Sequence, residues 1–400
     1  MNLFSFEKIG GDYPELGYAL QNGIPTDVYG VSDPQKYLIA AMVEGRAVYL
    51  AADALAAARA ANAIRALSNK RVCLLSAKDE VLLHRAALSK DALYRRLGAL
   101  YEWQTGADVL VCDLEAALQL VPRKVPYFRL ETGKETPMDA LVADLVRAGY
   151  TREYAVDGKG AFAVRGDILD IYPVNCEHPV RIDFFGDEVE SIKPYDETTG
   201  ERYPLIGRLD IVAATDVVLD AGEEEELARL LQREIDGSGD TRQAARRRAI
   251  AQAIEANDYR SDYLMPVLRN ACGLLSLVGD ALIVLDECKL LRDRAEALYK
   301  EHFNRLSVLE EGGETMSFSG GQYVPAQEIQ DLSGRRVLSL GAFLSNSTFF
   351  RPLKMMSFTS TPARRYLNSL PDLITDLAAW RSTGYRVVLC CGTPERKQKL

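Results

Sequence analysis

The sequence has few of the residues and patterns that build metal sites, disulfide frameworks or membrane spans. Its three histidines, His84, His178 and His302, lie far apart and have no cysteine or carboxylate cluster at ligand spacing. The seven cysteines lie mostly in apolar, strand-like runs and form no CxxC pair, as is typical of buried thiols in a reducing cytoplasm. No apolar run approaches the roughly 18 residues that cross a bilayer, and the N-terminus lacks a basic region followed by an apolar core. We therefore expect a cytoplasmic protein that holds no metal and does not contact a membrane.

The sequence also lacks an excess of positive charge. Its formal net charge of -9, with 48% hydrophobic and 26% charged residues, argues against a domain that grips nucleic acid through a broad basic surface. One basic cluster, Arg242 and Arg246–Arg248, follows a glutamate run at 223–226 in a segment of strong helix formers. We expect an exposed helical hairpin with a solvated charged face, on which the two runs could pair. The alternative, in which this cluster contacts DNA phosphates, predicts an affinity that falls steeply with salt.

The pattern of apolar runs predicts several domains. Between residues 27 and 122, short apolar strands alternate with helical segments, which is the pattern of a parallel α/β sheet. A strand meander interrupts this pattern, and an apolar strand at 280–287 with a long helix restores it. We therefore expect four segments: the first part of a parallel α/β domain (1–122), an inserted α+β domain (123–213), the second part of the α/β domain with the charged hairpin (214–322), and a small α/β domain (323–400). A helix start at Thr393 stops after about one turn, so we expect that last domain to be truncated.

The order of strands and helices resembles that of a nucleotide-binding motor, but the residues at the expected phosphate loop do not. Helicase-type motors share an early β-α-β unit and a later strand that ends in two acids, here Asp286–Glu287, and their first strand opens into a phosphate loop ending GK[ST]. The corresponding turn, residues 30–36, is GVSDPQK. Pro34 removes an amide donor and Asp33 adds negative charge where phosphate would bind, so we expect the pocket to be lost. The two acids are then the relic of a metal-binding pair or a simple strand-end turn. The alternative, an atypical loop that still binds ATP, requires Lys36.

The most informative segment, residues 160–196, alternates like a strand meander but places charged and aromatic residues on the side that faces water. In its run VRIDFF, three apolar residues point one way, whereas Arg181, Asp183 and Phe185 point the other. Arg165 ends the preceding strand. Arginine and phenylalanine on one solvent side are typical of a protein contact. In the alternative interpretation, Arg165 or Arg181 pairs with Asp183 and Phe185 packs under the hairpin.

The motifs GxFxVRGDILDIYP and PVRIDFFGDEVESIKPYD, followed by TTGER, closely resemble the N-terminal region of the bacterial transcription-repair coupling factor family, Mfd. The same block resembles the UvrA-interaction domain of the excision nuclease subunit UvrB. A UvrB protein would need a working phosphate loop and a DESH motif, whereas this sequence has GVSDPQK and DECK. The resemblance therefore favours the coupling factors. It implies a degenerate helicase-like parallel α/β domain, interrupted by an antiparallel UvrA-interaction domain and followed by a small, incomplete α/β domain.

The resemblance implies a non-catalytic module that recruits UvrA to RNA polymerase stalled at DNA lesions, in transcription-coupled nucleotide excision repair. By position, the implied UvrA-contacting residues are Arg165, Arg181 and Phe185, with no catalytic, cofactor-binding or metal-binding residue. ATP and Mg²⁺, and the contacts with RNA polymerase and DNA, are expected of motor domains outside this chain. The competing hypothesis is a nucleotide-dependent, UvrB-like DNA-processing protein with an atypical phosphate loop.

Overall fold

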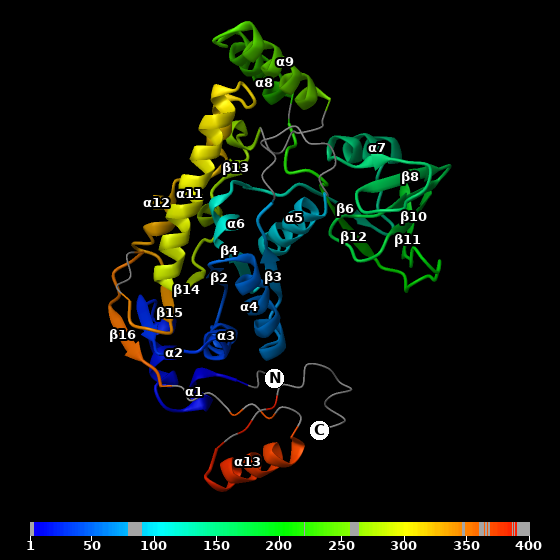
Figure 1. The fold of residues 1–400 in the computed structure, drawn as a ribbon. Helices are drawn as coiled ribbons and strands as arrows, with labels where there is room; N and C mark the ends of the chain where they lie inside the picture. The colour runs from blue at the N-terminus through cyan, green and yellow to red at the C-terminus, as the bar shows by residue number, and fades with distance from the viewer. Residues whose placement is uncertain are drawn as a thin grey trace.

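The structure, a computed structural model, describes residues 4–78, 90–219, 221–256, 264–345, 349–359, 364, 366, 369–385, 387 and 389. His84 and the helix start expected at Thr393 lie outside the described residues. Figure 1 shows a central α/β body, a small antiparallel domain at its side, a helical hairpin at one end and a separate helix at the other. The expected combination of a parallel α/β sheet and a separate antiparallel sheet is confirmed.

A seven-stranded, parallel sheet forms the body. Its order is β16 (Lys354–Ser357), β1 (Thr26–Tyr29), β15 (Val337–Gly341), β14 (Leu282–Asp286), β2 (Ala47–Ala51), β4 (Val109–Asp113) and β3 (Val72–Leu75). β1 to β4 precede the small domain in the chain, whereas β14, β15 and β16 follow it. Because β14 and β15 lie between β1 and β2, the chain returns to the middle of its own sheet after the insertion.

The two faces of this sheet pack against different helices. Along β2, Ala47, Tyr49 and Ala51 belong to one apolar core and Val48 and Leu50 to the other, because successive side chains of a strand point to opposite faces. The first core includes side chains of α1 (Phe6–Ile9), α2 (Tyr13–Gln21), α3 (Asp33–Met42) and α4 (Ala54–Leu67). The second includes side chains of α5 (Asp91–Gln104), α6 (Leu114–Leu118), α11 (Cys288–Glu311) and α12 (Ala326–Gln330). Burial of both faces explains why the strands are apolar without alternation.

The expectation of a separate domain at 323–400 is wrong for its first two strands. β15 pairs with both β1 and β14, and β16 pairs with β1, so both belong to the large sheet. All five residues of β15 are buried. A buried apolar strand needs neighbours on both sides, but its sequence does not specify which sheet supplies them. In contrast, α13 (Leu370–Ser382) has no buried residue and stands apart from the body (Figure 1).

The small domain contains two sheets and one helix. Its larger sheet is the meander of β8 (Ala161–Arg165), β9 (Ile168–Ile171), β10 (Val180–Phe185) and β11 (Glu188–Pro194), with β7 (Thr151–Arg152) parallel to β8. β6 (Tyr127–Glu131) pairs with β12 (Arg208–Val212), and α7 (Met138–Arg147) precedes the meander. The antiparallel meander expected at 160–196 is therefore confirmed. Its inner residues Phe162 and Ile182 belong to the same apolar cluster as Leu97 of α5, so the domain shares a core with the body.

The expected charged hairpin is formed by α8 (Ala221–Asp236) and α9 (Thr241–Glu255). Asp240 caps α9, since its carboxylate accepts a hydrogen bond from the Gln243 amide at 2.8 Å. Two arginines of the basic cluster pair outside the glutamate run at 223–226: Arg246 with Glu314, beyond the end of α11, and Arg247 with Glu234 of α8. The ion pairs are Arg246–Glu314, Arg247–Glu234, Arg229–Glu225 and Arg269–Glu226. The remaining short elements are β5 (Val121–Pro122), β13 (Ala271–Cys272), η1 (Met265–Val267), η2 (Leu274–Leu277) and η3 (Ser317–Gln322).

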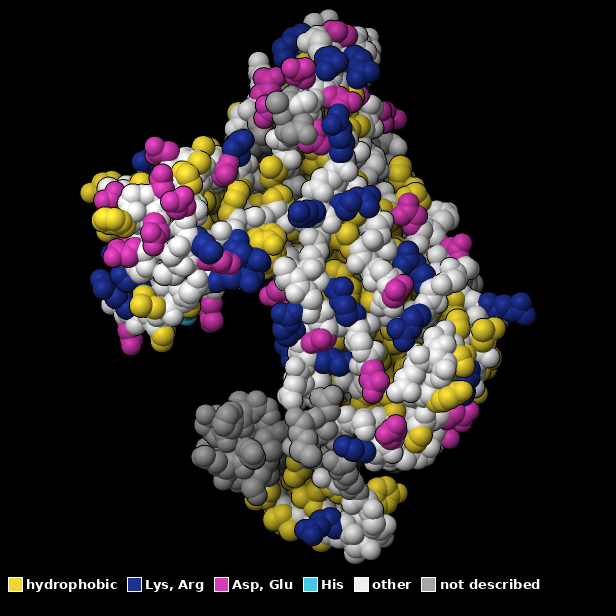
Figure 2. All heavy atoms as spheres, turned by 180° about the vertical axis from the view of Figure 1, so that it is seen from behind, with side chains coloured by type: hydrophobic (Ala, Val, Ile, Leu, Met, Phe, Trp, Pro, Cys, Tyr) yellow, Lys and Arg dark blue, Asp and Glu magenta, His cyan; other side chains and the backbone are white. Residues whose placement is uncertain are grey.

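The surface carries mixed charge. In the view of Figure 2, acidic and basic side chains are interspersed over the body, and apolar side chains lie among them on the small domain. Within the described ranges, no helix is long and apolar enough to span a membrane. The same residues include no group of three or more histidine, cysteine or acidic side chains that would hold a metal ion.

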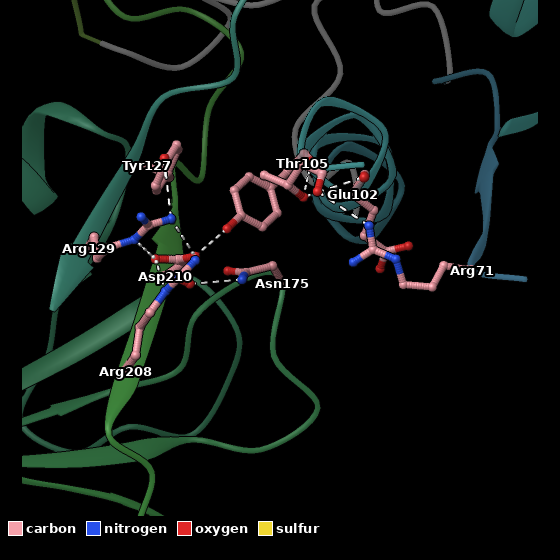
Figure 3. A network of polar contacts seen from close by, with 9 residues as sticks. Arg71, Glu102, Thr105, Tyr127, Arg129, Asn175, Arg208 and Asp210 are labelled. Carbon is pink, nitrogen blue, oxygen red and sulfur yellow. Dashed lines mark hydrogen bonds and ion pairs between the residues drawn. The ribbon is translucent and has the colours of Figure 1, made fainter. Parts of the chain in front are cut away.

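A carboxylate in β12, Asp210, connects the small domain to α5 (Figure 3). Its Oδ1 accepts a hydrogen bond from Nε of Arg129 at 2.8 Å, and its Oδ2 accepts one from Nη2 of Arg208 at 2.6 Å. The hydroxyl of Tyr101, on α5, donates to the same Oδ2. Burial on its own raises the pKa of Asp210, but these donors outweigh burial and hold the pKa well below its ordinary value.

We predict that Asp210→Asn lowers the free energy of unfolding by about 1–3 kcal/mol near neutral pH, because charge-assisted hydrogen bonds are lost. A carboxylate whose pKa is lowered by folding adds stability above its unfolded pKa of about 4, and this stability is lost as the pH falls through the folded value. The difference between the two proteins should therefore shrink as the pH falls from about 5 to about 2. Urea unfolding followed by the fluorescence of Trp103, which is buried in α5, measures this difference.

Asp157→Asn is the control for this measurement, since Asp157 lies on an exposed loop. A difference between wild type and Asp210→Asn that stays constant over the whole pH range would contradict the role given to the Asp210 carboxylate.

Candidate functional site

The outward face of the meander brings the predicted contact residues together. In the cross-strand register, Arg165 on β8 lies opposite Ile168 on β9, which lies opposite Asp183 on β10. Arg181 lies two residues before Asp183 and Phe185 two residues after it, so all three side chains of β10 share this face. We call this side of the sheet the outward face. The sequence-based grouping of Arg165, Arg181 and Phe185 on one surface agrees with their positions.

Phe185 projects into solvent from the end of β10. Its side chain is 79% exposed, whereas its inward neighbour Phe184 is 4% exposed. It precedes a tight turn in which Gly186 has a φ of 61°, a conformation that glycine adopts at no steric cost. The alternative in which Phe185 packs under the hairpin is therefore wrong.

Arg181 is engaged within the protein. Its Nε and Nη2 donate to the two carboxylate oxygens of Asp170 on β9, at 2.7 and 2.8 Å. This bidentate contact raises the pKa of Arg181. Asp183, the partner considered from sequence, instead accepts hydrogen bonds from Ser191 and Lys193 on β11. Asp170 was missed because it lies on another strand, and only the β9–β10 register places it directly opposite Arg181.

Arg165 is held by an aromatic residue that the sequence analysis also missed. Its Nη2 donates to the backbone carbonyl of Tyr154 at 2.9 Å, and its guanidinium carbon lies 5.2 Å from the centroid of the Tyr154 ring. Tyr154 is 91% exposed. The only sequence signal was a tyrosine among small and charged residues in the run TREYAVDGKG, which gives no indication of its partner.

A second set of residues occupies the position of the missing phosphate loop. Lys36, in the first turns of α3, is 2% exposed, and its Nζ lies 2.7 Å from both Oδ1 of Asp286 and Oε1 of Glu287. The hydroxyl of Tyr49 donates to the other oxygen of Asp286 at 2.8 Å. Burial on its own lowers the pKa of Lys36, but the two carboxylates outweigh it and raise the pKa above its ordinary value. The two acids are thus more than a plain strand-end turn, because both hold the lysine.

The amides of the same turn are also engaged. The Val31 amide donates to the carbonyl of Gly341 at 3.2 Å, the Ser32 amide donates to the Gln35 side chain at 2.9 Å, and Pro34 has no amide hydrogen. A Cβ atom placed on Gly30 would lie 2.0 Å from the carbonyl oxygen of Phe358, so the residues after β16 cover the turn. At least two amides of the turn that corresponds to a phosphate loop are therefore engaged within the protein, and a third position has no amide hydrogen.

We predict that Lys36→Met lowers the free energy of unfolding by about 3–5 kcal/mol, because it leaves the buried Asp286 carboxylate without its counterion. The double variant Lys36→Met/Asp286→Asn should recover part of this loss, since the buried Asp286 charge is then absent together with the lysine. Chemical unfolding of the wild type, both single variants and the double variant measures the coupling. Additive losses would mean that the ion pair does not stabilise the sheet.

Comparison with known proteins supports the resemblance seen in the motifs. Residues 128–216 match the family described as UvrB interaction domain. The chain is 23% identical over 356 residues to the transcription-repair-coupling factor of Bacillus subtilis (strain 168), covering 84% of this chain and 30% of that protein. It is 32% identical over 155 residues to the factor of Myxococcus xanthus, covering 37% of this chain and 13% of that protein.

A shorter match involves the excision nuclease. The chain is 41% identical over 92 residues to UvrABC system protein B of Thermosynechococcus vestitus, covering 23% of this chain and 14% of that protein. The chain thus spans less than a third of the length of these relatives. It is similar to the N-terminal region of transcription-repair coupling factors over most of its own length, as the motifs indicated.

Proposed function

We propose that this chain is the UvrA-recruiting module of a transcription-repair coupling factor and acts in transcription-coupled nucleotide excision repair. The observation that carries the proposal is the outward face. Arg165, Arg181 and Phe185, the positions implied by the family motif, share this face within the residues that match the UvrB interaction domain. A strongly exposed phenylalanine beside arginines on a rigid sheet is the composition of a protein-binding hot spot.

The three residues would contribute to binding in different ways. Phe185 is the apolar anchor, since full burial of a phenylalanine side chain is worth about 1.5–3 kcal/mol. Arg165 offers a charge that no carboxylate of the described residues neutralises. Arg181, already paired with Asp170, presents its remaining guanidinium edge and links β9 to β10.

The proposal includes no ATP chemistry in this chain. The buried ion pairs of Lys36 and the engaged amides of Val31 and Ser32 oppose the alternative of an atypical phosphate loop. ATP and Mg²⁺, RNA polymerase and DNA are proposed as ligands of other parts of a full-length coupling factor in the cytoplasm. The alternative of a DNA-binding arginine cluster is weakened because Arg246 and Arg247 are engaged in ion pairs.

Calorimetric titration with purified UvrA tests the proposal. We predict that Phe185→Ala weakens binding about tenfold or more, because the apolar anchor of the contact is lost. Phe343→Ala is the matched control, since Phe343 is 82% exposed but follows β15 in the body, and it should bind like wild type. Equal affinities of Phe185→Ala and Phe343→Ala, or no binding by the wild type, would refute the proposal.

The roles of the two arginines in binding need a separate set of variants. Arg181→Ala alone leaves Asp170 without its counterion, so a loss of affinity would have two causes. We predict that Arg181→Ala/Asp170→Ala keeps more affinity for UvrA than Arg181→Ala does. We also predict that Arg165→Ala loses affinity for UvrA without a loss of folding stability. The same titration, with thermal unfolding of each variant, separates contact from folding. Arg165→Ala that unfolds at a clearly lower temperature would contradict this division.

A further inference from the structure

Tyr154 belongs to a loop whose backbone is fixed against the meander. β7 pairs in parallel with β8, and the amide of Glu153 donates to the carbonyl of Phe162 at 2.8 Å. The carbonyl of Tyr154 itself accepts the hydrogen bond from Arg165. The ring of Tyr154 nevertheless remains 91% exposed. An aromatic side chain on an anchored backbone loses little conformational freedom on binding, which is why tyrosine is favoured at protein contacts.

The charges on the outward face distinguish Arg165 from its neighbours. Arg181 is paired with Asp170, and Lys193 is paired with Asp183. Arg165 is held by a carbonyl and an aromatic ring, neither of which carries a formal charge. Among the described residues of this face, Arg165 is therefore the arginine whose charge is left for a partner. The ring beneath its guanidinium restricts where that charge can point.

The position of this pair complements that of Phe185. Ile168, which is partly buried, lies between Arg165 and Asp183 in the register, and Phe185 follows two residues later on β10. β8 and β10 are two strand spacings apart, about 10 Å. The outward face thus presents an aromatic-supported cation at the β7–β8 edge and an apolar anchor at the end of β10, with an apolar residue between them.

We propose that Tyr154 and Arg165 act as one recognition unit, which binds an acidic side chain bordered by apolar surface on UvrA. This inference rests on the proposed function and assigns Tyr154 to its interface. The guanidinium pairs with the carboxylate, and the Tyr154 ring both orients the guanidinium and packs against the apolar border. Removal of the ring therefore affects the contact twice, whereas removal of only the tyrosine hydroxyl affects neither role.

The test is calorimetric titration of UvrA with wild type, Tyr154→Ala and Tyr154→Phe. We expect Tyr154→Ala to weaken binding about fivefold to tenfold and Tyr154→Phe to bind within about twofold of wild type. Tyr18→Ala is the matched control, because Tyr18 is 64% exposed on α2 in the body, and it should leave binding unchanged. All variants should unfold at the wild-type temperature, since each substituted ring is exposed.

The double variant Tyr154→Ala/Arg165→Ala tests whether the two residues act together. As one unit, they should lose less affinity in combination than the sum of the two single losses. Strictly additive losses, or Tyr154→Ala that binds like wild type while Phe185→Ala fails to bind, would overturn the inference and leave the proposed function standing. Absence of binding by the wild type would instead overturn the proposed function, and this inference with it.

Discussion

The buried ammonium of Lys36 is the contact on which the arrangement of the large sheet depends. It joins α3, before the inserted domain, to the end of β14, after it, across 250 residues of sequence. A buried cation is tolerated only when it is paired and hydrogen-bonded. Here the carboxylates of Asp286 and Glu287, each 2.7 Å from Nζ of Lys36, meet that requirement. Glu287 has a φ of 61°, which is unusual for a residue with a side chain, and its carboxylate also accepts the Ala342 amide at 2.8 Å. The strained residue thus ties β14, β15 and α3 together.

The small domain packs against the body whose sheet this ion pair holds together. The inner side chains of the meander continue the apolar core of the body, and Asp210 adds a polar connection through Tyr101 of α5. Packing fixes which side chains of the meander point inward. Because successive side chains of a strand point to opposite faces, the same packing also fixes which side chains point into solvent. The exposure of Phe185 follows from this constraint: Phe184 takes the inward position, so its neighbour must face water.

The sequence was sufficient for features that depend on periodicity. Alternation in VRIDFF placed Arg181 and Phe185 on the solvent side, and uninterrupted apolar runs indicated buried parallel strands. It was insufficient for partners that depend on register or distant pairing. Asp170 for Arg181, Tyr154 for Arg165 and the acids for Lys36 all come from other elements, and nothing in the local pattern specifies them. For the same reason β15 was assigned to the wrong domain, since a buried strand does not encode its neighbours.

The occupied turn at residues 30–36 also bears on how a recruiting surface of this kind is controlled. In a nucleotide-binding motor, the phosphate loop and the acids of the later strand change partners with the nucleotide, and this change moves the attached elements. Here those groups are bound to one another. A ligand shifts a conformation only through a difference in affinity between two states, and the engaged lysine, acids and amides would have to leave their present partners to supply one. Under the proposed function, the outward face is therefore carried by a body in which the turn that corresponds to a phosphate loop is held by its own side chains.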